Sequence, residues 1–203
     1  MKHPAAAGSA PDALVAQRLQ TFATLLLHWN RRINLIARGD APLVWERHID
    51  DSAQLAPLLP PRGGIVDLGS GAGFPGLVLS IVTGRHADLI EADQRKCAFL
   101  RTAARACAAD VLVHAVRAEA AELPPAAVVT ARGFAPVRAL LPIAARLLAP
   151  DGVALLLKGR SAEEELTAAR GEWHMHAERF PSRTSPGATI LRISEIRRAA
   201  AVS

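Results

Sequence analysis

The sequence predicts an α/β fold, in which a mostly parallel sheet of seven strands ends in an antiparallel hairpin and follows a helical extension. Between residues 65 and 170, short apolar runs alternate with helical patterns, which is typical of parallel strands joined by helices on both faces of one sheet. The last two apolar runs, 173–180 and 189–196, have no helix between them and are joined through a Pro186-Gly187 turn. These two runs are therefore expected to pair as a hairpin.

Residues 1–62 are expected to form a tail and a helical extension, with the core domain over residues 63–203. Asp12 is a candidate cap for a first helix, and a second helix is expected over 45–59. The first helix carries a single apolar stripe, which favours docking on a core. The stripe consists of Val15, Leu19, Phe22, Leu26, Trp29 and Ile33.

The elements of the core follow in order along the chain. Strands are expected at 65–68, 86–91, 111–114, 127–131 and 153–158, before the two hairpin strands. Helices are expected over 75–82, 94–107 and 137–148. A capping box from Ser161 to Glu164 is predicted to open one more helix.

The glycine-rich segment after the first strand predicts a nucleotide-like cofactor. Glycines between a strand and a helix let the backbone turn tightly and approach a ligand closely. Two patterns overlap here: Gly71-x-Gly73-x-x-Gly76 fits a dinucleotide loop, and Asp67-x-Gly69-x-Gly71-x-Gly73 fits the loop of S-adenosylmethionine-dependent methyltransferases. A pyrophosphate prefers a helix N-terminus without a nearby anion, whereas an ammonium and a sulfonium suit a carboxylate. Asp67 therefore favours S-adenosylmethionine.

A second acid follows the next strand. Glu91 lies about 20 residues past the loop, where a ribose-binding acid is expected. Asp93 is a rival for the same role. A parallel sheet that closes in a hairpin is also the methyltransferase layout, and a plain dinucleotide fold lacks this hairpin.

Composition and charge narrow the class of protein further. The 203-residue chain has a net charge of +5 and a pI of about 10.2, which favours a polyanionic partner. No apolar run approaches the ~20 residues of a membrane span, and residues 1–10 lack the apolar core of a signal peptide. Cys97 and Cys107 lie on one predicted helix, ~15 Å apart at 1.5 Å per residue, too far to bridge. We expect a cytoplasmic protein with no metal site.

Several motifs across most of the chain resemble those of one family, the 16S rRNA (guanine-N7) methyltransferase G family, also called glucose-inhibited division protein B. The Phe-Pro after the third glycine and the Ala-Arg-Gly-Phe-Ala segment are far more specific than the glycines. The matching motifs are Trp29-Asn30-x-x-x-Asn34-Leu35, His48-x-x-Asp51-Ser52, Asp67–Gly76, Arg95-Lys96-x-x-Phe99-Leu100-Arg101, Arg117-Ala118-Glu119, Ala131–Ala135 and Leu157-Lys158-Gly159. The family usually has Asp-Ser where this chain has Glu91-Ala92.

The resemblance implies a class I S-adenosylmethionine-dependent methyltransferase with a Rossmann-like sheet. It implies methyl transfer to N7 of one guanine of 16S rRNA near the decoding region. The cofactor contacts carried over by motif are Gly69, Phe74, Ala118, Glu119 and Arg132. In physical terms, a backbone N–H at Ala118 could bond an adenine ring, and Glu119 could accept its amine. Arg132 could meet either the methionine carboxylate or the RNA.

Substrate binding is expected to use donors and basic side chains around this site. Arg132, Lys158 and Arg160 are candidates for positioning the guanine, and no acid or base is expected to be essential, because N7 carries no proton. The sequence suggests no physical role for His48, Asp51 and Ser52 beyond lining the cofactor pocket or capping a turn. The residues expected to contact RNA are Arg31, Arg32, Arg38, Arg47, Arg95, Lys96, Arg101, Lys158, Arg160 and Arg183.

The partner is expected to be 16S rRNA, the small ribosomal subunit or its assembly intermediate, with the enzyme a monomer lacking an obligate protein partner. Three alternatives stay open at the level of sequence. A methyltransferase could act on another RNA or on a small molecule, and an NAD-linked dehydrogenase would share the glycines but tolerate Asp67 poorly. A non-catalytic RNA-binding module would not need the cofactor loop.

Overall fold

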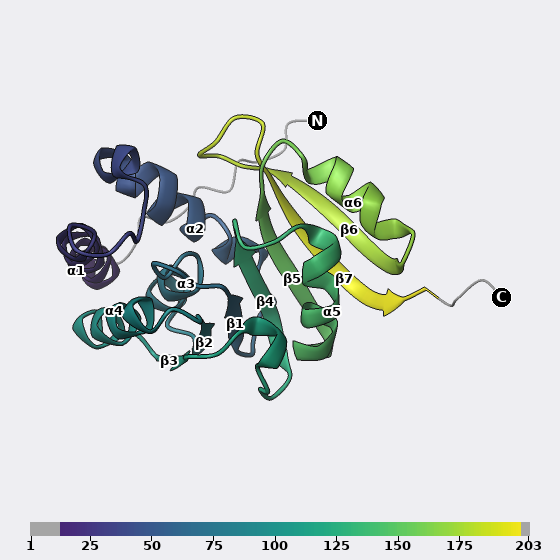
Figure 1. The fold of residues 1–203 in the computed structure, drawn as a ribbon, viewed down its shortest axis with the longest axis horizontal. Helices are drawn as coiled ribbons and strands as arrows, with labels where there is room; N and C mark the ends of the chain where they lie inside the picture. Colours follow the sequence, from purple (N-terminus) through teal and green to yellow (C-terminus); the bar gives the residue numbers. More distant parts are fainter. Residues whose placement is uncertain (1–12, 200–203) are drawn as a thin grey trace.

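The structure is a computed structural model that describes residues 13–199, so the predicted cap Asp12 lies outside the described residues. It contains one seven-stranded sheet with the strand order β3-β2-β1-β4-β5-β7-β6 (Figure 1). The first five strands are parallel, and β7 is antiparallel to both β5 and β6. The strands are β1 Ile65–Leu68, β2 Ala87–Ile90, β3 Val111–His114, β4 Ala126–Arg132, β5 Leu148–Lys158, β6 Trp173–Pro181 and β7 Thr189–Arg198. The predicted sheet and its terminal hairpin are confirmed.

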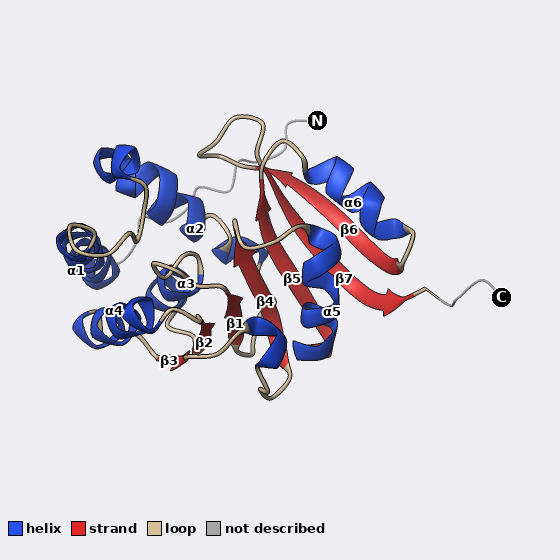
Figure 2. Ribbon diagram, viewed as in Figure 1, coloured by secondary structure: helices blue, strands red, loops and turns tan. Residues whose placement is uncertain are grey.

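Helices cover both faces of this sheet, and each face has its own apolar core. One core joins α1, α3 and α4 to strand residues such as Ile65 and Val128; the other joins α5 and α6 to residues such as Val66 and Val129. Figure 2 shows α5 and α6 beside β5, β6 and β7. The helices are α1 Ala13–Trp29, α2 Asp51–Ala53, α3 Gly76–Thr83, α4 Gln94–Ala106, α5 Val137–Leu147 and α6 Ala162–Arg170, with short turns η1 Arg38–Leu43, η2 Trp45–Asp50, η3 Ala56–Leu58 and η4 Ala118–Ala120.

The first helix docks on the core as predicted but ends earlier than its apolar stripe. Leu19, Phe22 and Leu26 are buried, and the Phe22 ring meets Phe74 edge-on at 5.3 Å. The helix stops at Trp29, because the Asn30 side chain accepts hydrogen bonds from the backbone N–H groups of residues 35 and 36. An Asn side chain that bonds nearby backbone in this way competes with helix continuation. The predicted division at residue 62 stays a prediction. Across that position, α1 shares one apolar core with α3 and α4.

The prediction of one continuous helix over 45–59 is wrong. The segment contains a wide π-type turn, η2, followed by the single turn α2 and the 3-10 turn η3. Pro57 lacks the N–H that an α-helix would need at this place, which ends regular helix before it. The Ser52 hydroxyl donates to the His48 carbonyl within the bend. This irregular segment places His48 of η2 and Asp51 of α2 beside Arg132 at the end of β4.

Two further expectations are corrected near the second half of the sheet. Strand β5 begins at Leu148 instead of Val153, because Leu148 already pairs with Ala126 ahead of a register shift. The capping box of Ser161 and Glu164 does not form. The Ser161 hydroxyl instead donates to the Glu165 carboxylate at 2.9 Å, so it bonds no N–H of α6.

Candidate active site

The glycine loop between β1 and α3 forms at the carboxyl end of the central strand. Gly69, Gly71 and Gly73 have φ values of 63°, 55° and 94°, which side chains rarely adopt. Gly76 has a different role, because a Cβ there would lie 2.5 Å from both Asp67 Cβ and a Leu89 methyl carbon. The first turn of α3 therefore rests directly on β1 and β2. The helix begins at Gly76, after a cis peptide bond between Phe74 and Pro75.

Glu91 joins this loop to the end of β2. Its Oε2 accepts a hydrogen bond from the Gly71 N–H at 2.9 Å, and its Oε1 accepts one from the Asp93 N–H at 2.8 Å. The rival acid Asp93 caps α4 instead, because its Oδ1 accepts from the N–H groups of Arg95 and Lys96 at 2.8 and 3.4 Å. The geometry therefore places Glu91, and not Asp93, beside the glycine loop.

A cleft of about 310 Å³ opens above these residues, and we call it the glycine cleft. Five of the predicted cofactor residues line it: Gly69, Gly71, Glu91, Ala118 and Glu119. The other lining residues are Ile90, Ala92, Lys96, Val116, Arg117, Gly133 and Phe134. The Phe134 ring lies so close to Gly69 that a Cβ at residue 69 would overlap it.

Three other predicted cofactor residues, Asp67 at the end of β1 and Gly73 and Phe74 in the loop itself, do not line the glycine cleft. Asp67 is fully buried, and burial raises the pKa of its carboxyl to about 6. Its Oδ1 accepts a hydrogen bond from the Thr130 hydroxyl at 2.7 Å, while Oδ2 has no hydrogen-bond partner among the described residues. The expected contact between Asp67 and a cationic ligand is therefore not what this geometry offers; Asp67 supports the loop from below.

One residue of this site, Arg146 on α5, was not predicted from the sequence. Its Nη2 donates to the carbonyls of Ala118 and Glu119 at 3.1 Å each, and its Nη1 donates to the carbonyl of Ala121. These bonds fix the turn η4, which forms one wall of the glycine cleft. The basic residue in the last turn of a helix had no local motif that could reveal this role.

A second cleft of about 310 Å³ lies alongside the first, and Gly133 lines both. We call it the polar cleft because most of the residues that line it have hydroxyl or charged side chains. Its lining consists of Arg47, His48, Asp51, Arg132, Gly133, Leu157, Lys158, Gly159, Ser182, Thr184, Ser185, Ala188 and Thr189. These residues come from the N-terminal segment, the ends of β4 and β5, and the β6–β7 loop. The shared glycine makes the two clefts neighbours at the carboxyl edge of the sheet, where open α/β sheets bind ligands.

Arg132 is the most constrained side chain of the polar cleft. Its guanidinium lies 4.7 Å from the centroid of the Phe74 ring, and it donates to the Arg47 carbonyl at 3.0 Å. It also lies 3.4 Å from an Asp51 carboxylate oxygen and 2.9 Å from His48 Nδ1. Burial lowers the pKa of Arg132 from its usual value. Arg132 lines the polar cleft only, so of its two predicted roles the geometry favours the one toward the substrate.

His48 is neutral in this arrangement. Burial, followed by the charge of Arg132, lowers its pKa to about 4. Because Nδ1 accepts from Arg132, the hydrogen of the neutral ring belongs on Nε2, which faces Asp40 at 3.4 Å without the geometry of a hydrogen bond. The ring also stacks on Phe74 with centroids 5.1 Å apart. His48, for which the sequence suggested no specific role, therefore supports Arg132.

The predicted positioning residues Lys158 and Arg160 differ from Arg132. Lys158 borders the polar cleft, but its side chain is only 8% exposed. Its ammonium donates to the Ala135 carbonyl at 2.5 Å and pairs with Glu165 at 2.8 Å. Arg160 is exposed, lies beside Gly187 in the β6–β7 loop, and lines neither cleft. Lys158 therefore anchors the segment after β4, and Arg160 stands outside the cleft.

The N-terminal segment and the β6–β7 loop are joined by side chains across the polar cleft. Asp51 Oδ1 accepts from the Thr184 hydroxyl at 2.6 Å and from Gln54 Nε2 at 2.8 Å. Gln54 Oε1 in turn accepts from the Arg183 N–H at 2.8 Å. This network holds the loop over the end of β5.

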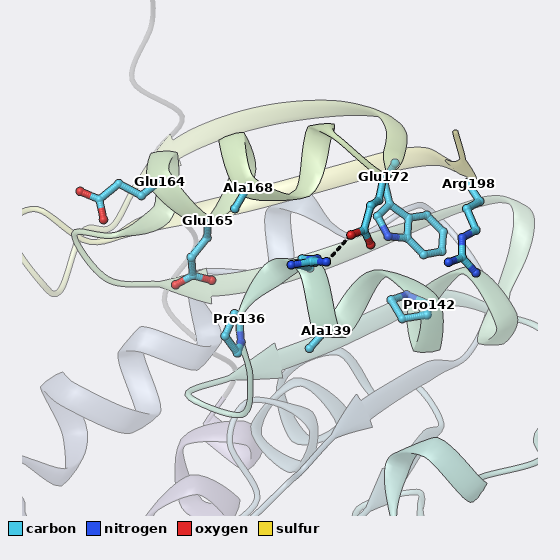
Figure 3. Close-up of a pocket in the computed structure, with 10 residues that line it drawn as sticks. Pro136, Ala139, Pro142, Glu164, Glu165, Ala168, Glu172 and Arg198 are labelled. Carbon is cyan, nitrogen blue, oxygen red and sulfur yellow. Dashed lines mark hydrogen bonds and ion pairs between the residues drawn. The ribbon is translucent and has the colours of Figure 1, made fainter. Parts of the chain in front are cut away.

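A hollow larger than either cleft lies elsewhere, between α5, α6 and the start of β6, with a volume of about 680 Å³ (Figure 3). Pro136, Ala139 and Pro142 form one side and Ala168 the other, with the ion pair of Glu172 and Arg138 across it. None of its lining residues belongs to the glycine loop or to the acids beside it. Size alone therefore does not identify the candidate active site.

Other expectations concern features away from the two clefts. Cys97 and Cys107 are free and buried on the α4 side of the sheet, as predicted. Residues 13–199 contain no group of His, Cys, Asp and Glu that could hold a metal ion, and within that range no helix is long and apolar enough to span a membrane. Of the residues predicted to contact RNA, all except Lys96 and Lys158 are exposed.

Comparison with known proteins identifies the family. A family model described as rRNA small subunit methyltransferase G (GidB) matches residues 15–187. The ribosomal RNA small subunit methyltransferase G of Granulibacter bethesdensis is 53% identical over 193 residues, which cover 95% of this chain and 91% of that protein. The protein of the same name from Rhodospirillum centenum is 56% identical over 180 residues, covering 88% of this chain and 83% of that protein.

Solved structures support the fold. TYW2 of M. jannaschii, solved in complex with AdoMet, has a TM-score of 0.58 at 16% identity, and the match covers 83% of this chain and 80% of that one. A ribosomal protein L11 methylase from Lactobacillus delbrueckii subsp. bulgaricus has a TM-score of 0.57 at 15% identity, covering 70% and 77%. The fold is that of a class I S-adenosylmethionine-dependent methyltransferase, and the chain belongs to the rRNA small subunit methyltransferase G family.

Proposed function

We propose that this enzyme transfers a methyl group from S-adenosylmethionine to N7 of a guanine in 16S rRNA near the decoding region. The observation that carries the proposal is the meeting of the glycine cleft and the polar cleft at Gly133. One cleft suits the methyl donor, and the adjacent one suits a polar base. The names of the relatives, which are ribosomal RNA small subunit methyltransferases, support an rRNA substrate.

The residues of the glycine cleft fit S-adenosylmethionine. Gly69 and Gly71 leave their backbone bare where the ligand must approach. Each Glu91 oxygen already accepts one backbone N–H, and its second lone pair is available to a ribose hydroxyl. The Ala118 N–H and the Glu119 carboxylate suit an adenine ring and its amine. The bound cofactor supplies an electrophilic methyl group on its sulfonium.

The chain contributes alignment rather than proton transfer. Guanine N7 has an in-plane lone pair and no proton, so the reaction needs no general base. His48 is neutral and bonded to Arg132, which leaves it no base role at this site. Holding the base and the donor in adjacent clefts can contribute about 7–11 kcal/mol through effective molarity. Arg132, held by His48, Arg47 and Phe74, is the positioning residue that borders the substrate side.

The binding surface for RNA is provided by exposed basic side chains, of which Arg47 lines the polar cleft. Arg31 and Arg32 lie in the turn after α1, Arg47 lies in η2, and Arg183 lies in the β6–β7 loop. Such side chains neutralise phosphates and make affinity fall with salt. The enzyme acts as a cytoplasmic monomer on the small ribosomal subunit, on its assembly intermediate or on free 16S rRNA.

Transfer of labelled methyl groups onto 16S rRNA and 30S particles tests this function, with mapping of the modified base. The expected product is a single N7-methylguanine. Calorimetric binding of S-adenosylmethionine, with NAD as the matched control, tests the cofactor separately. Binding of S-adenosylmethionine without methylation of 16S rRNA would point to another RNA or to a small-molecule acceptor. Binding of NAD instead would refute the cofactor.

A further inference from the structure

Asp51 is the single carboxylate among the residues that line the polar cleft. Its side chain is 14% exposed and stands in the first turn of α2. The two carboxylate oxygens differ in their surroundings. Oδ1 accepts two close hydrogen bonds, from Thr184 and Gln54, whereas Oδ2 has one long contact of 3.4 Å with Arg132 Nη1. Oδ2 therefore keeps acceptor capacity, since a carboxylate oxygen offers about two lone-pair sites.

The donor groups of guanine match the free acceptor site on Asp51 Oδ2. N7 lies on one side of the fused ring, and the N1–H and the N2 amine lie on the opposite side. If N7 faces the glycine cleft across Gly133, the N1 and N2 edge points into the polar cleft. Enzymes that modify a base outside the helix read it by hydrogen bonds to this Watson–Crick edge. Guanine presents two donors there, whereas adenine presents an acceptor at N1.

We propose that Asp51 determines the specificity for guanine, with the remaining acceptor site of its Oδ2 taking a hydrogen bond from the N2 amine of the target base. This inference rests on the proposed function, because it needs a guanine whose N7 faces the glycine cleft. Thr184 and Gln54 are positioning residues that orient the carboxylate. Adenine is rejected because it lacks the N2 amine, and its N1 lone pair lies next to the same negative oxygen.

The arrangement also explains why the acid stands on the N-terminal segment. Its bond to Thr184 joins it to the β6–β7 loop, and its contact with Arg132 joins it to the end of β4. Arg132 balances the charge of the carboxylate without covering the second lone pair of Oδ2. The acid is therefore fixed from both sides of the cleft and presents one oxygen inward.

The test compares two substrates and three variants. 30S particles are reconstituted with 16S rRNA that carries either guanine or inosine at the target position; inosine lacks only the N2 amine. A lost hydrogen bond to a charged group corresponds to about a 10- to 100-fold loss of kcat/KM, so the wild type should prefer guanine by that factor. In Asp51→Ala the activity on guanine should fall and the guanine-to-inosine ratio should approach one.

Asp51→Asn and Gln54→Met complete the design. Asp51→Asn keeps the side-chain volume, should also bring the ratio toward one, and decides the matter if Asp51→Ala fails to fold. Gln54→Met removes a support of Asp51 but leaves the carboxylate, so it should lower activity on both substrates while the preference for guanine persists. S-adenosylmethionine affinity, measured by calorimetry for each variant, reports whether the glycine cleft is intact.

The outcomes separate this inference from the function on which it rests. If the wild type methylates guanine and Asp51→Asn loses activity equally on both substrates, Asp51 only supports the site and the specificity assignment is overturned. If the wild type transfers no methyl to 16S rRNA while binding S-adenosylmethionine, the proposed function fails, and the assignment fails with it.

Discussion

The glycine cleft and the polar cleft meet at Gly133 but are built in different ways. The glycine cleft is lined by segments that follow the adjacent parallel strands β1, β2, β3 and β4. The polar cleft is made by side chains from the N-terminal segment, the end of β4 and the β6–β7 loop, joined by bonds such as that of Asp51 to Thr184, 133 residues apart. The proposed cofactor site thus follows from segments at the ends of successive strands, whereas the proposed substrate site exists only once distant segments have packed.

The largest expected effect concerns the glycine loop. Gly76→Ala places a methyl group 2.5 Å from the Cβ of buried Asp67 and 2.5 Å from a Leu89 methyl carbon. The Asp67 Cβ is bonded to the backbone of β1 and cannot move aside as a side-chain end can. Overpacking of this kind costs about 1–3 kcal/mol, and here it also lifts the glycine loop from β1. We expect a lower free energy of unfolding in urea and at least a tenfold weaker S-adenosylmethionine affinity.

Gly64→Ala is the matched control, because its added Cβ meets nothing within 4 Å. This variant should bind S-adenosylmethionine like the wild type. Equal losses in the two variants would show that close packing of the loop on β1 is not what makes the site.

Two arginines allow the contributions of the two clefts to be tested separately. Arg146 fixes the η4 wall of the glycine cleft through three carbonyls, and Arg132 borders the polar cleft. A lysine cannot reproduce a planar, multidentate guanidinium. Arg146→Lys should weaken S-adenosylmethionine binding about tenfold with little change in KM for the ribosomal substrate, given one or two lost hydrogen bonds.

Arg132→Lys should lower kcat/KM for the ribosomal substrate about 10- to 100-fold and leave cofactor affinity within a few-fold, since bonds to a charged group are lost. Parallel losses in both assays for either variant would contradict the separation.

The two clefts also differ in the pH dependence of their buried groups. Asp67, under the glycine cleft, has a pKa raised to about 6, so folding takes up a proton between pH 4 and 6, and its contribution to stability is lost as pH rises through 6. His48, beside the polar cleft, has a pKa lowered to about 4, so its contribution is lost as pH falls from 6.5 to 4.

Urea unfolding at pH values between 4.5 and 7.5 measures both slopes. From the low end of this range to the high end, Asp67→Asn should gain stability relative to the wild type, whereas His48→Gln should lose it. Each change should be on the order of 2–3 kcal/mol across the range, from shifts of about two pKa units. Slopes of the same sign would mean that one of the two burial effects is misassigned.

The smallest effect is expected at the exposed surface. Arg31→Ala combined with Arg32→Ala should weaken RNA binding and reduce the slope of log affinity against log salt by about 0.7–0.9 for each phosphate that is no longer neutralised. S-adenosylmethionine affinity should not change. Arg138→Ala, in the α5–α6 hollow away from both clefts, is the control, since it also removes positive charge. An unchanged salt slope in the double variant would remove the turn after α1 from the RNA surface.

The sequence anticipated the sheet, the hairpin and five of the residues that line the glycine cleft. Glu91 follows a predicted strand, and parallel neighbours bring the ends of β1 and β2 to one edge, so its place beside Gly71 could be inferred. Phe74 was expected to face the cofactor but is 4% exposed, because its ring supports Arg132 and His48 from within the core. Lys158 was expected to face the substrate but is bonded to Ala135 and Glu165.

By itself, the sequence determined what depends on neighbours along the chain. Strand periodicity, the positive φ values that need glycine, and the acid at each strand end are local properties, and they define the sheet and the position of the glycine cleft. Only the tertiary structure decided which side chain faces which cleft. The broken helix around Pro57, the neutral His48, and the bonds of Asp51 and Arg146 depend on burial and on partners many residues away. No local pattern records those partners, because they become neighbours only when the sheet and its two layers of helices have packed.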